Sequence, residues 1–310
     1  MTEEMTLTYY VSKEYNGRLL RDYLKNCLNL SRAELTSLKK REDGMMLNGV
    51  RVTVRALLKE GDELILSRND ESCSEGIIPV NIGIDIIYED DDIIALNKPP
   101  FMPTHPSHDH QDDTLANGLT YYYESKGIPF VFRAVNRLDR DTSGIVLVAK
   151  NKYSAFILSK QISEFKVEKK YLAIAEGEMS GRGRIEASIK RIEESKIKRC
   201  VCGNDEGQYA LTEYEVLESH NGMSLLSVTL KTGRTHQIRL HLSHIGHSIL
   251  GDTLYGNENG SVLISRQALH AYSLSFTHPT SNEKITLCAP LPPDMAELIS
   301  AEMKEKICRK

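Results

Sequence analysis

An irregular mixture of strand-like and helix-like segments is the feature that most limits the folds open to this chain. Short apolar runs of strand length recur from residue 84 onwards, and amphipathic segments of helical period separate only some of them. Strict alternation would indicate a doubly wound parallel sheet, so its absence favours the α+β class. We predict strands at 84–88, 93–97, 145–149, 171–175, 209–217 and 225–230, and helices at 114–125, 152–164, 235–245 and 294–306.

The first 70 residues follow a different pattern. Apolar residues over 18–29 have the spacing of one helical face, and Ser31 with Glu34 forms a capping box for a second helix. Asn48-Gly49 is a type I′ hairpin signal between two short strands. We therefore predict three parts: a small domain at 12–68, a linker at 69–80 and a larger domain at 81–310.

The charge of the chain is unevenly distributed. The formal net charge is −4, yet residues 13–68 carry 12 Lys and Arg against 8 Asp and Glu. Residues 69–95 carry 8 acidic residues and no basic one, so the acidic excess is confined to this stretch. The N-terminal segment is mildly basic, and local patches of that kind are what meet phosphates.

Several classes of protein are disfavoured. No apolar run approaches the roughly 20 residues of a membrane-spanning helix, and the N-terminus lacks the basic and apolar regions of a secretory signal. Among six scattered cysteines only Cys200 and Cys202 are close, which does not complete a zinc site. We expect a cytoplasmic protein with reduced thiols and no membrane partner.

One segment, residues 134–150, places a charged loop directly before an apolar strand. Asp139 and Asp141 lie among Arg137 and Arg140. A neighbouring arginine favours the ionised form of a carboxylate, and an ionised carboxylate suits a nucleophile better than a general acid. The other interpretation is a surface cluster of salt bridges, which composition alone favours.

A second segment, residues 231–244, follows the strand that ends at Leu230. Thr235 is predicted to cap the next helix, and Arg234, His236 and Arg239 near its start indicate an anion site. Several histidines on this segment suggest a metal site, but their spacing drifts around the helix and no carboxylate ligand is evident.

A third segment, residues 97–113, leaves a predicted strand and contains four prolines, which exclude regular structure. It begins with Asn97-Lys98 and ends in a region rich in histidine and aspartate. These His and Asp residues leave open a metal-dependent hydrolase, although their spacing matches no metal motif.

These segments, in this order, resemble the RluA-type pseudouridine synthases from about residue 84 to 290. The resemblance rests on Asn97-Lys98-Pro99, RLDRDTSG at 137–144, Lys170-Tyr171, GRTHQIRLH at 233–241, Gly251-Asp252 and Tyr255-Gly256. Residues 17–66 are similar to the small S-four-type RNA-binding domain often fused ahead of this catalytic domain. The fold implied is a mixed, mainly antiparallel central sheet with flanking helices, plus a small N-terminal α/β domain.

The resemblance also implies roles for individual residues. Asp139 matches the essential aspartate, Tyr171 the active-site tyrosine and Arg239 the arginine that pairs with the aspartate. Arg137 matches the arginine that enters the RNA stack where the target base leaves. The family often has histidine where this chain has Asn136, which cannot titrate. The predicted substrate-binding residues are Arg137, Asn136, Lys98, Arg234, His236 and Leu230.

The chemistry of uridine isomerisation fits these residue types. A uridine inside a helix must first be flipped out, at a cost of a few kcal/mol. The Asp139 carboxylate then attacks C1′ or C6, or abstracts a sugar proton, and the sequence does not choose among these. Neither a metal nor a nucleotide cofactor is expected. We predict a monomer acting on structured RNA, ribosomal more than transfer RNA; the alternative is a non-catalytic RNA-binding protein of the same fold.

Overall fold

The structure is a computed structural model. It describes residues 6–28, 30, 35–36, 38–39, 43–67, 74, 76–193, 195, 197–203, 206–258 and 260–308. The predicted capping box at Ser31 and Glu34 lies outside the described residues, and so do residues 69–73 and 75 of the predicted linker. Within the described chain, no helix combines the length and the hydrophobicity that crossing a bilayer requires.

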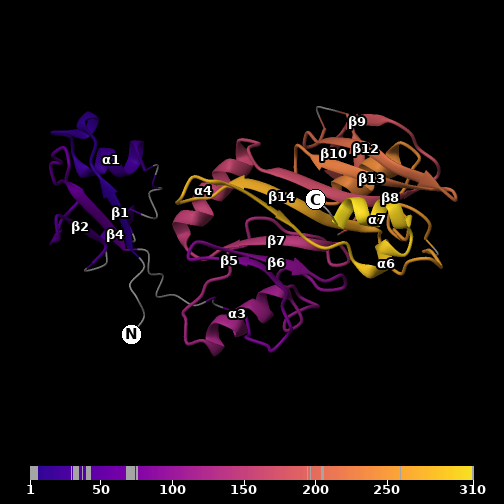
Figure 1. The fold of residues 1–310 in the computed structure, drawn as a ribbon, viewed down its shortest axis with the longest axis horizontal. Coiled ribbons are helices and arrows are strands. Elements are labelled where there is room, and N and C mark those ends of the chain that lie inside the picture. The colour runs from indigo at the N-terminus through magenta and orange to yellow at the C-terminus, as the bar shows by residue number, and fades with distance from the viewer. Residues whose placement is uncertain are drawn as a thin grey trace.

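A nine-stranded sheet forms the centre of the larger part of the molecule (Figure 1). Its pairings are antiparallel except that of β7 with β14, which confirms the predicted α+β class with a mainly antiparallel sheet. In spatial order the strands are β5 (Ile86–Glu89), β6 (Ile93–Lys98), β7 (Ser143–Ala149), β14 (Leu269–Thr277), β8 (Glu168–Glu176), β13 (Met223–Leu230), β12 (Leu211–His220) and β9 (Arg182–Glu186), while β15 (Lys284–Cys288) pairs with β14.

Helices cover both faces of the sheet around β6 and β7. Alternate residues of these strands, such as Ile94 and Val146, pack with α3 (Leu115–Ser125), and the intervening ones, such as Leu147, pack with α4 (Lys152–Ser163). Because both faces are buried, β7 is apolar almost throughout. Thr114 caps α3 in a capping box with Asn117.

The end of the chain differs from the prediction of one helix over 294–306. Two short helices occur instead, α6 (Pro293–Ala296) and α7 (Ala301–Cys308). The hydroxyl of Ser300 accepts a hydrogen bond from the Met303 N–H, so the second helix begins at its own capping residue. Met295, Met303 and Ile307 belong to the main core, which is why these helices lie against the sheet (Figure 1).

The N-terminal residues build a separate four-stranded sheet with its own core (Figure 1). The predicted type I′ hairpin is confirmed, since Asn48 and Gly49 both have positive φ, of 50° and 76°. The first strand was not predicted, and it extends this sheet before residue 12. Tyr153 of α4 packs against this core. The elements are β1 (Thr6–Tyr10), η1 (Lys13–Tyr15), α1 (Leu20–Asn26), β2 (Met45–Leu47), β3 (Val50–Arg51) and β4 (Glu63–Ser67).

Candidate active site

A cavity of about 1110 Å³ opens beside the middle of the large sheet, between segments that are far apart in sequence. Its lining includes the loop before β7, the start of β8, the end of β13 and the turn before α5 (Gln237–His244). This volume lies just above the range of ordinary ligand pockets, about 300–1,000 Å³. The cavity therefore collects the chemistry-bearing segments that the sequence indicated.

Asp139 lies in this cavity and meets Arg239, one hundred residues further along the chain. Nη1 of Arg239 donates to Asp139 Oδ2 at 3.1 Å. The other side of the guanidinium holds Asp252, with Nε and Nη2 donating to its two oxygens at 2.6 and 2.8 Å. Arg239 is therefore bonded to two carboxylates, one of them the aspartate with which it was expected to pair, and Arg234 and His236 remain as the cavity-lining members of the predicted anion site.

Asp252 orients Arg239, and it was missing from the predicted site residues. Its side chain is fully buried. Burial alone would raise the pKa of Asp252, but hydrogen bonds and charge from Arg239 outweigh burial, and the net shift is downward. The signal in the sequence was the Gly251-Asp252 pair. Gly251 has φ +76°, and a Cβ there would lie 2.2 Å from the Arg266 carbonyl oxygen, so only glycine fits.

Tyr171 comes from β8 and lines the same cavity. It is 8% exposed and belongs to the main core. Burial, with a smaller contribution from the charge of Asp139, raises the pKa of its phenol well above the ordinary value. The neutral ring is therefore strongly favoured, which suits stacking against a base better than removal of a proton.

His236 approaches Asp139 from the turn that begins α5. It is the N-cap residue of this helix, in a left-handed conformation, so the predicted cap at Thr235 and the predicted start of the helix there are wrong. Tyr255 Oη accepts from the backbone N–H of Arg199 and is hydrogen-bonded to His236 Nδ1 at 2.9 Å. Burial lowers the pKa of His236 and favours its neutral ring, whose Nε2 lies 3.9 Å from Asp139 Oδ2.

The loop that carries Asp139 is fixed by side chains beneath it. Lys98 is fully buried, and its ammonium donates to the carbonyls of Pro99, Met102 and Arg140 at 2.8, 2.8 and 2.9 Å. Burial lowers the pKa of Lys98 to about 7, although three carbonyl acceptors match the three donors of the charged form. Lys98 does not line the cavity, so its predicted contact with substrate is replaced by a contact with the loop.

Asn136 joins the same loop to β7. Its amide nitrogen donates to the Ile145 carbonyl at 3.0 Å, and its amide oxygen accepts from the Leu147 N–H at 2.8 Å. Both ends of the side chain are thus bonded to the strand, although the residue also lines the cavity. Its role here is to hold the loop, which requires no titration.

The remaining predicted substrate-binding residues, Arg137, Arg234 and Leu230, do line the cavity. The Arg137 guanidinium donates to Thr235 Oγ1 at 3.2 Å, so the loop and the turn before α5 meet at the rim. Asp141 instead forms the salt bridge that was the other interpretation of this segment, with its carboxylate 2.7 Å from Arg140 Nε.

The lining of the cavity contains six Arg and Lys residues and one carboxylate, that of Asp139. A basic cavity in a chain of net charge −4 indicates a polyanionic substrate.

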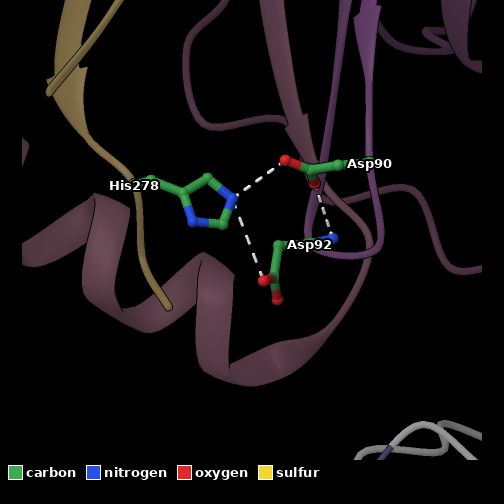
Figure 2. Close-up of side chains that lie close together, drawn as sticks. All are labelled: Asp90, Asp92 and His278. Atoms are coloured by element: carbon green, nitrogen blue, oxygen red, sulfur yellow. Dashed lines mark hydrogen bonds and ion pairs between the residues drawn. The ribbon is translucent and has the colours of Figure 1, made fainter. Parts of the chain in front are cut away.

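A cluster of Asp90, Asp92 and His278 lies outside this cavity and offers ligand atoms within 4.8 Å of one another (Figure 2). His278 Nδ1 accepts hydrogen bonds from the backbone N–H groups of Thr280 and Ser281. Its proton is then on Nε2, which lies 2.9 Å from Asp90 and donates to it. A protonated nitrogen cannot bind a metal, so the arrangement fits a hydrogen-bonded link between the β5–β6 turn and the end of β14.

The fold and the cavity thus define an enzyme site in which a carboxylate, oriented by a buried arginine, faces an anionic substrate. Residues 92–244 match the family model for RNA pseudouridylate synthase. The chain is 40% identical to the uncharacterized RNA pseudouridine synthase YjbO of Bacillus subtilis, over 94% of this chain and 98% of that protein. It is 36% identical to the ribosomal large subunit pseudouridine synthase D of Haemophilus ducreyi, over 97% and 96% of the two chains.

The structure of human RNA pseudouridylate synthase domain containing 1 is similar to 73% of this chain and 95% of its own length, with 29% identity and a TM-score of 0.58. The chain belongs to the RNA pseudouridine synthase family, in its RluA-type branch. It is therefore an isomerase whose substrate is RNA.

Proposed function

We propose that Asp139 performs the first chemical step on a flipped-out uridine. The observation that carries this proposal is the chain of bonds from Asp252 through Arg239 to Asp139. Attack at C1′, attack at C6 and abstraction of a sugar proton all require the charged carboxylate, and Arg239 stabilises that charge. Asp252 balances Arg239, so that the guanidinium is not a lone buried cation.

Tyr171 and the rim arginines complete this proposal. The neutral Tyr171 ring packs against the face of the flipped uracil, and Leu230 adds an apolar contact. Arg137, held by Thr235 at the rim, occupies the gap that the base leaves and offsets part of the cost of flipping. Arg234 and His236 bind the RNA around the target nucleotide. The reaction transfers no electrons or groups to a second molecule, so neither nucleotide cofactor nor metal takes part.

The substrate we propose is large-subunit ribosomal RNA, on which the relative from Haemophilus ducreyi acts according to its name. The enzyme would work in the cytoplasm as a monomer. Residues 12–68, with β1, would form an S-four-like RNA-binding domain, residues 69–80 a linker, and residues 81–310 the catalytic domain. The supporting observation is that the N-terminal sheet has a core of its own.

Mapping pseudouridine in cells that lack this protein tests the substrate. We expect modification to disappear at one or a few uridines of large-subunit ribosomal RNA and to return with the wild-type gene. The Asp139→Asn gene provides the matched control and should restore none of it. Loss confined to transfer RNA, or no loss at any site, would contradict the proposed substrate.

Deleting residues 1–70 tests the N-terminal domain. We expect weaker RNA binding with a smaller salt dependence, because residues 13–68 within the deleted segment carry 12 Lys and Arg against 8 Asp and Glu, whereas turnover at saturating RNA should change little. Affinity measured over a series of salt concentrations checks this. Tyr153 loses its packing partner in this variant, so Tyr153→Ser in the full chain serves as the control. Unchanged affinity and salt slope would show that the domain is not the RNA anchor.

A further inference from the structure

Phe165 is an exposed aromatic residue at the edge of the cavity. Its side chain is 67% exposed, and the residue is part of the cavity lining. It lies just after α4 and six residues before Tyr171, at the entrance to the strand that carries the tyrosine. Large exposed apolar side chains are common singly on surfaces, so exposure alone does not indicate a function.

The backbone at Phe165 makes this residue a costly choice. Its φ is +57°, in the left-handed region. The Phe165 N–H bonds to the Ile162 carbonyl, and the Lys166 N–H bonds to the Gln161 carbonyl, at 3.1 and 2.8 Å. These two bonds define a helix C-terminus of the Schellman type, where the left-handed position is usually glycine. Of the six described non-glycine residues with positive φ, three are asparagines, which tolerate it; besides Phe165, the others are His236 in the cavity and Phe101, which does not line it.

The charged residues around Phe165 indicate which kind of ligand its ring contacts. Lys169, Arg199 and Arg234 line the same cavity, and within the described chain none of them forms an ion pair with a carboxylate. Cations that track a phosphate backbone, together with an exposed aromatic ring, are the combination with which proteins bind unpaired nucleotides. Ile197, 61% exposed, adds a second apolar side chain to the lining.

We propose that the Phe165 ring is a stacking platform for an unpaired RNA base next to the target uridine. Flipping one nucleotide leaves its neighbours with an exposed face, and a ring at the cavity edge can cover such a face. The proposal rests on the RNA pseudouridine synthase activity of the family, and it does not depend on the roles proposed for Asp139 and Arg239.

Four substitutions at this position separate stacking from stability. Phe165→Ala removes the ring and keeps the unfavourable backbone, whereas Phe165→Gly removes both. Phe165→Leu keeps an apolar side chain without a π-face, and Phe165→Tyr keeps the ring. The matched control is Val262→Ala, because Val262 is fully exposed and does not line the cavity. The probe is total RNA from cells that lack the protein, which contains the target whichever RNA carries it.

The initial rate of pseudouridine formation is measured against RNA concentration, with nucleosides separated by liquid chromatography. We expect the Ala, Gly and Leu variants to raise KM about tenfold with little change in kcat, because stacking is present in both ground and transition states. Phe165→Tyr and Val262→Ala should stay within about twofold of wild type on the same scale. The Tm of Phe165→Gly should equal or exceed that of wild type.

Wild-type KM in the Gly variant would overturn the proposal, and so would wild-type KM in the Leu variant. A loss of kcat without a change in KM would overturn it as well. All variants retain Asp139, so the KM and kcat of each variant relative to wild type are independent of which RNA is modified and of the chemistry proposed for the carboxylate.

Discussion

Replacing Asp139 with asparagine is expected to abolish pseudouridine formation, with a loss of about four or more orders of magnitude in rate. The substitution changes one charge and almost no volume. Arg239 keeps its two hydrogen bonds to Asp252, so the fold should remain intact. Product formation in a single-turnover assay checks this, alongside RNA affinity, which we expect to change by less than about threefold because one hydrogen-bonding group replaces another.

Asp141→Asn is the matched control for that experiment. Asp141 lies two residues away in the same loop, but its side chain pairs with Arg140 at the surface. The Arg140 side chain is 53% exposed and that of Asp141 24%, and a partly exposed pair of this kind contributes little to stability, so this variant should keep near wild-type activity. Substantial product from Asp139→Asn, or equal losses in both variants, would contradict the role proposed for Asp139.

Replacing Asp252 with alanine is expected to lower the free energy of unfolding by about 3–5 kcal/mol and to reduce activity strongly. The change leaves the Arg239 guanidinium buried without its main partner, and it removes the acceptor for the Leu254 and Tyr255 N–H groups. Urea unfolding and the pseudouridine assay measure the two effects. Asp252→Asn is the comparison. Its amide oxygen can still accept hydrogen bonds from those N–H groups, but the side chain no longer carries a negative charge.

The stability difference between wild type and Asp252→Ala should depend on pH, and the direction of the pKa shift of Asp252 determines how. The pKa of Asp252 is lower in the folded chain than its ordinary value of 3.8, so the charged form stabilises the fold. This contribution is complete above the unfolded pKa and is lost as the pH falls through the folded pKa. The difference in free energy of unfolding between wild type and Asp252→Ala should therefore narrow only below about pH 3.8. A gap that is unchanged well below that pH would show that charge is not the reason for the loss.

Much of the fold was predictable because hydrophobic periodicity and turn-forming residues are local features of the sequence. The strands β6, β7 and β13 lie close to their predicted ranges, and so do α3 and α4. The strands β14 and β15 were missed. Four of the nine residues of β14 are His, Ser or Thr, and two of them, His270 and Ser275, are buried with polar partners from other strands. His270, for example, bonds to Ser143 across a parallel pairing that only the complete sheet creates.

That parallel pairing also explains a residue of the motif that carries Asp139. Gly144 has φ +109°, and a Cβ there would lie 2.3 Å from the Ala271 carbonyl oxygen. The motif could be read in the sequence, but its reason is a close contact between strands that are far apart in the chain.

The sequence by itself determined the family and the α+β class, and the match of residues 137–144 to the family motif selected Asp139 rather than Asp141. Local charge could not separate Asp139 from Asp141, since both have arginine neighbours and a surface salt bridge would suit either. The order of the strands supplies the physical difference between them: it brings Arg239 and Asp252 to Asp139 and leaves Asp141 with Arg140. The same packing buried Lys98 under the loop and left Phe165 open at the cavity edge. Such choices of partner depend on contacts across one hundred residues, and these exist only once the sheet has formed.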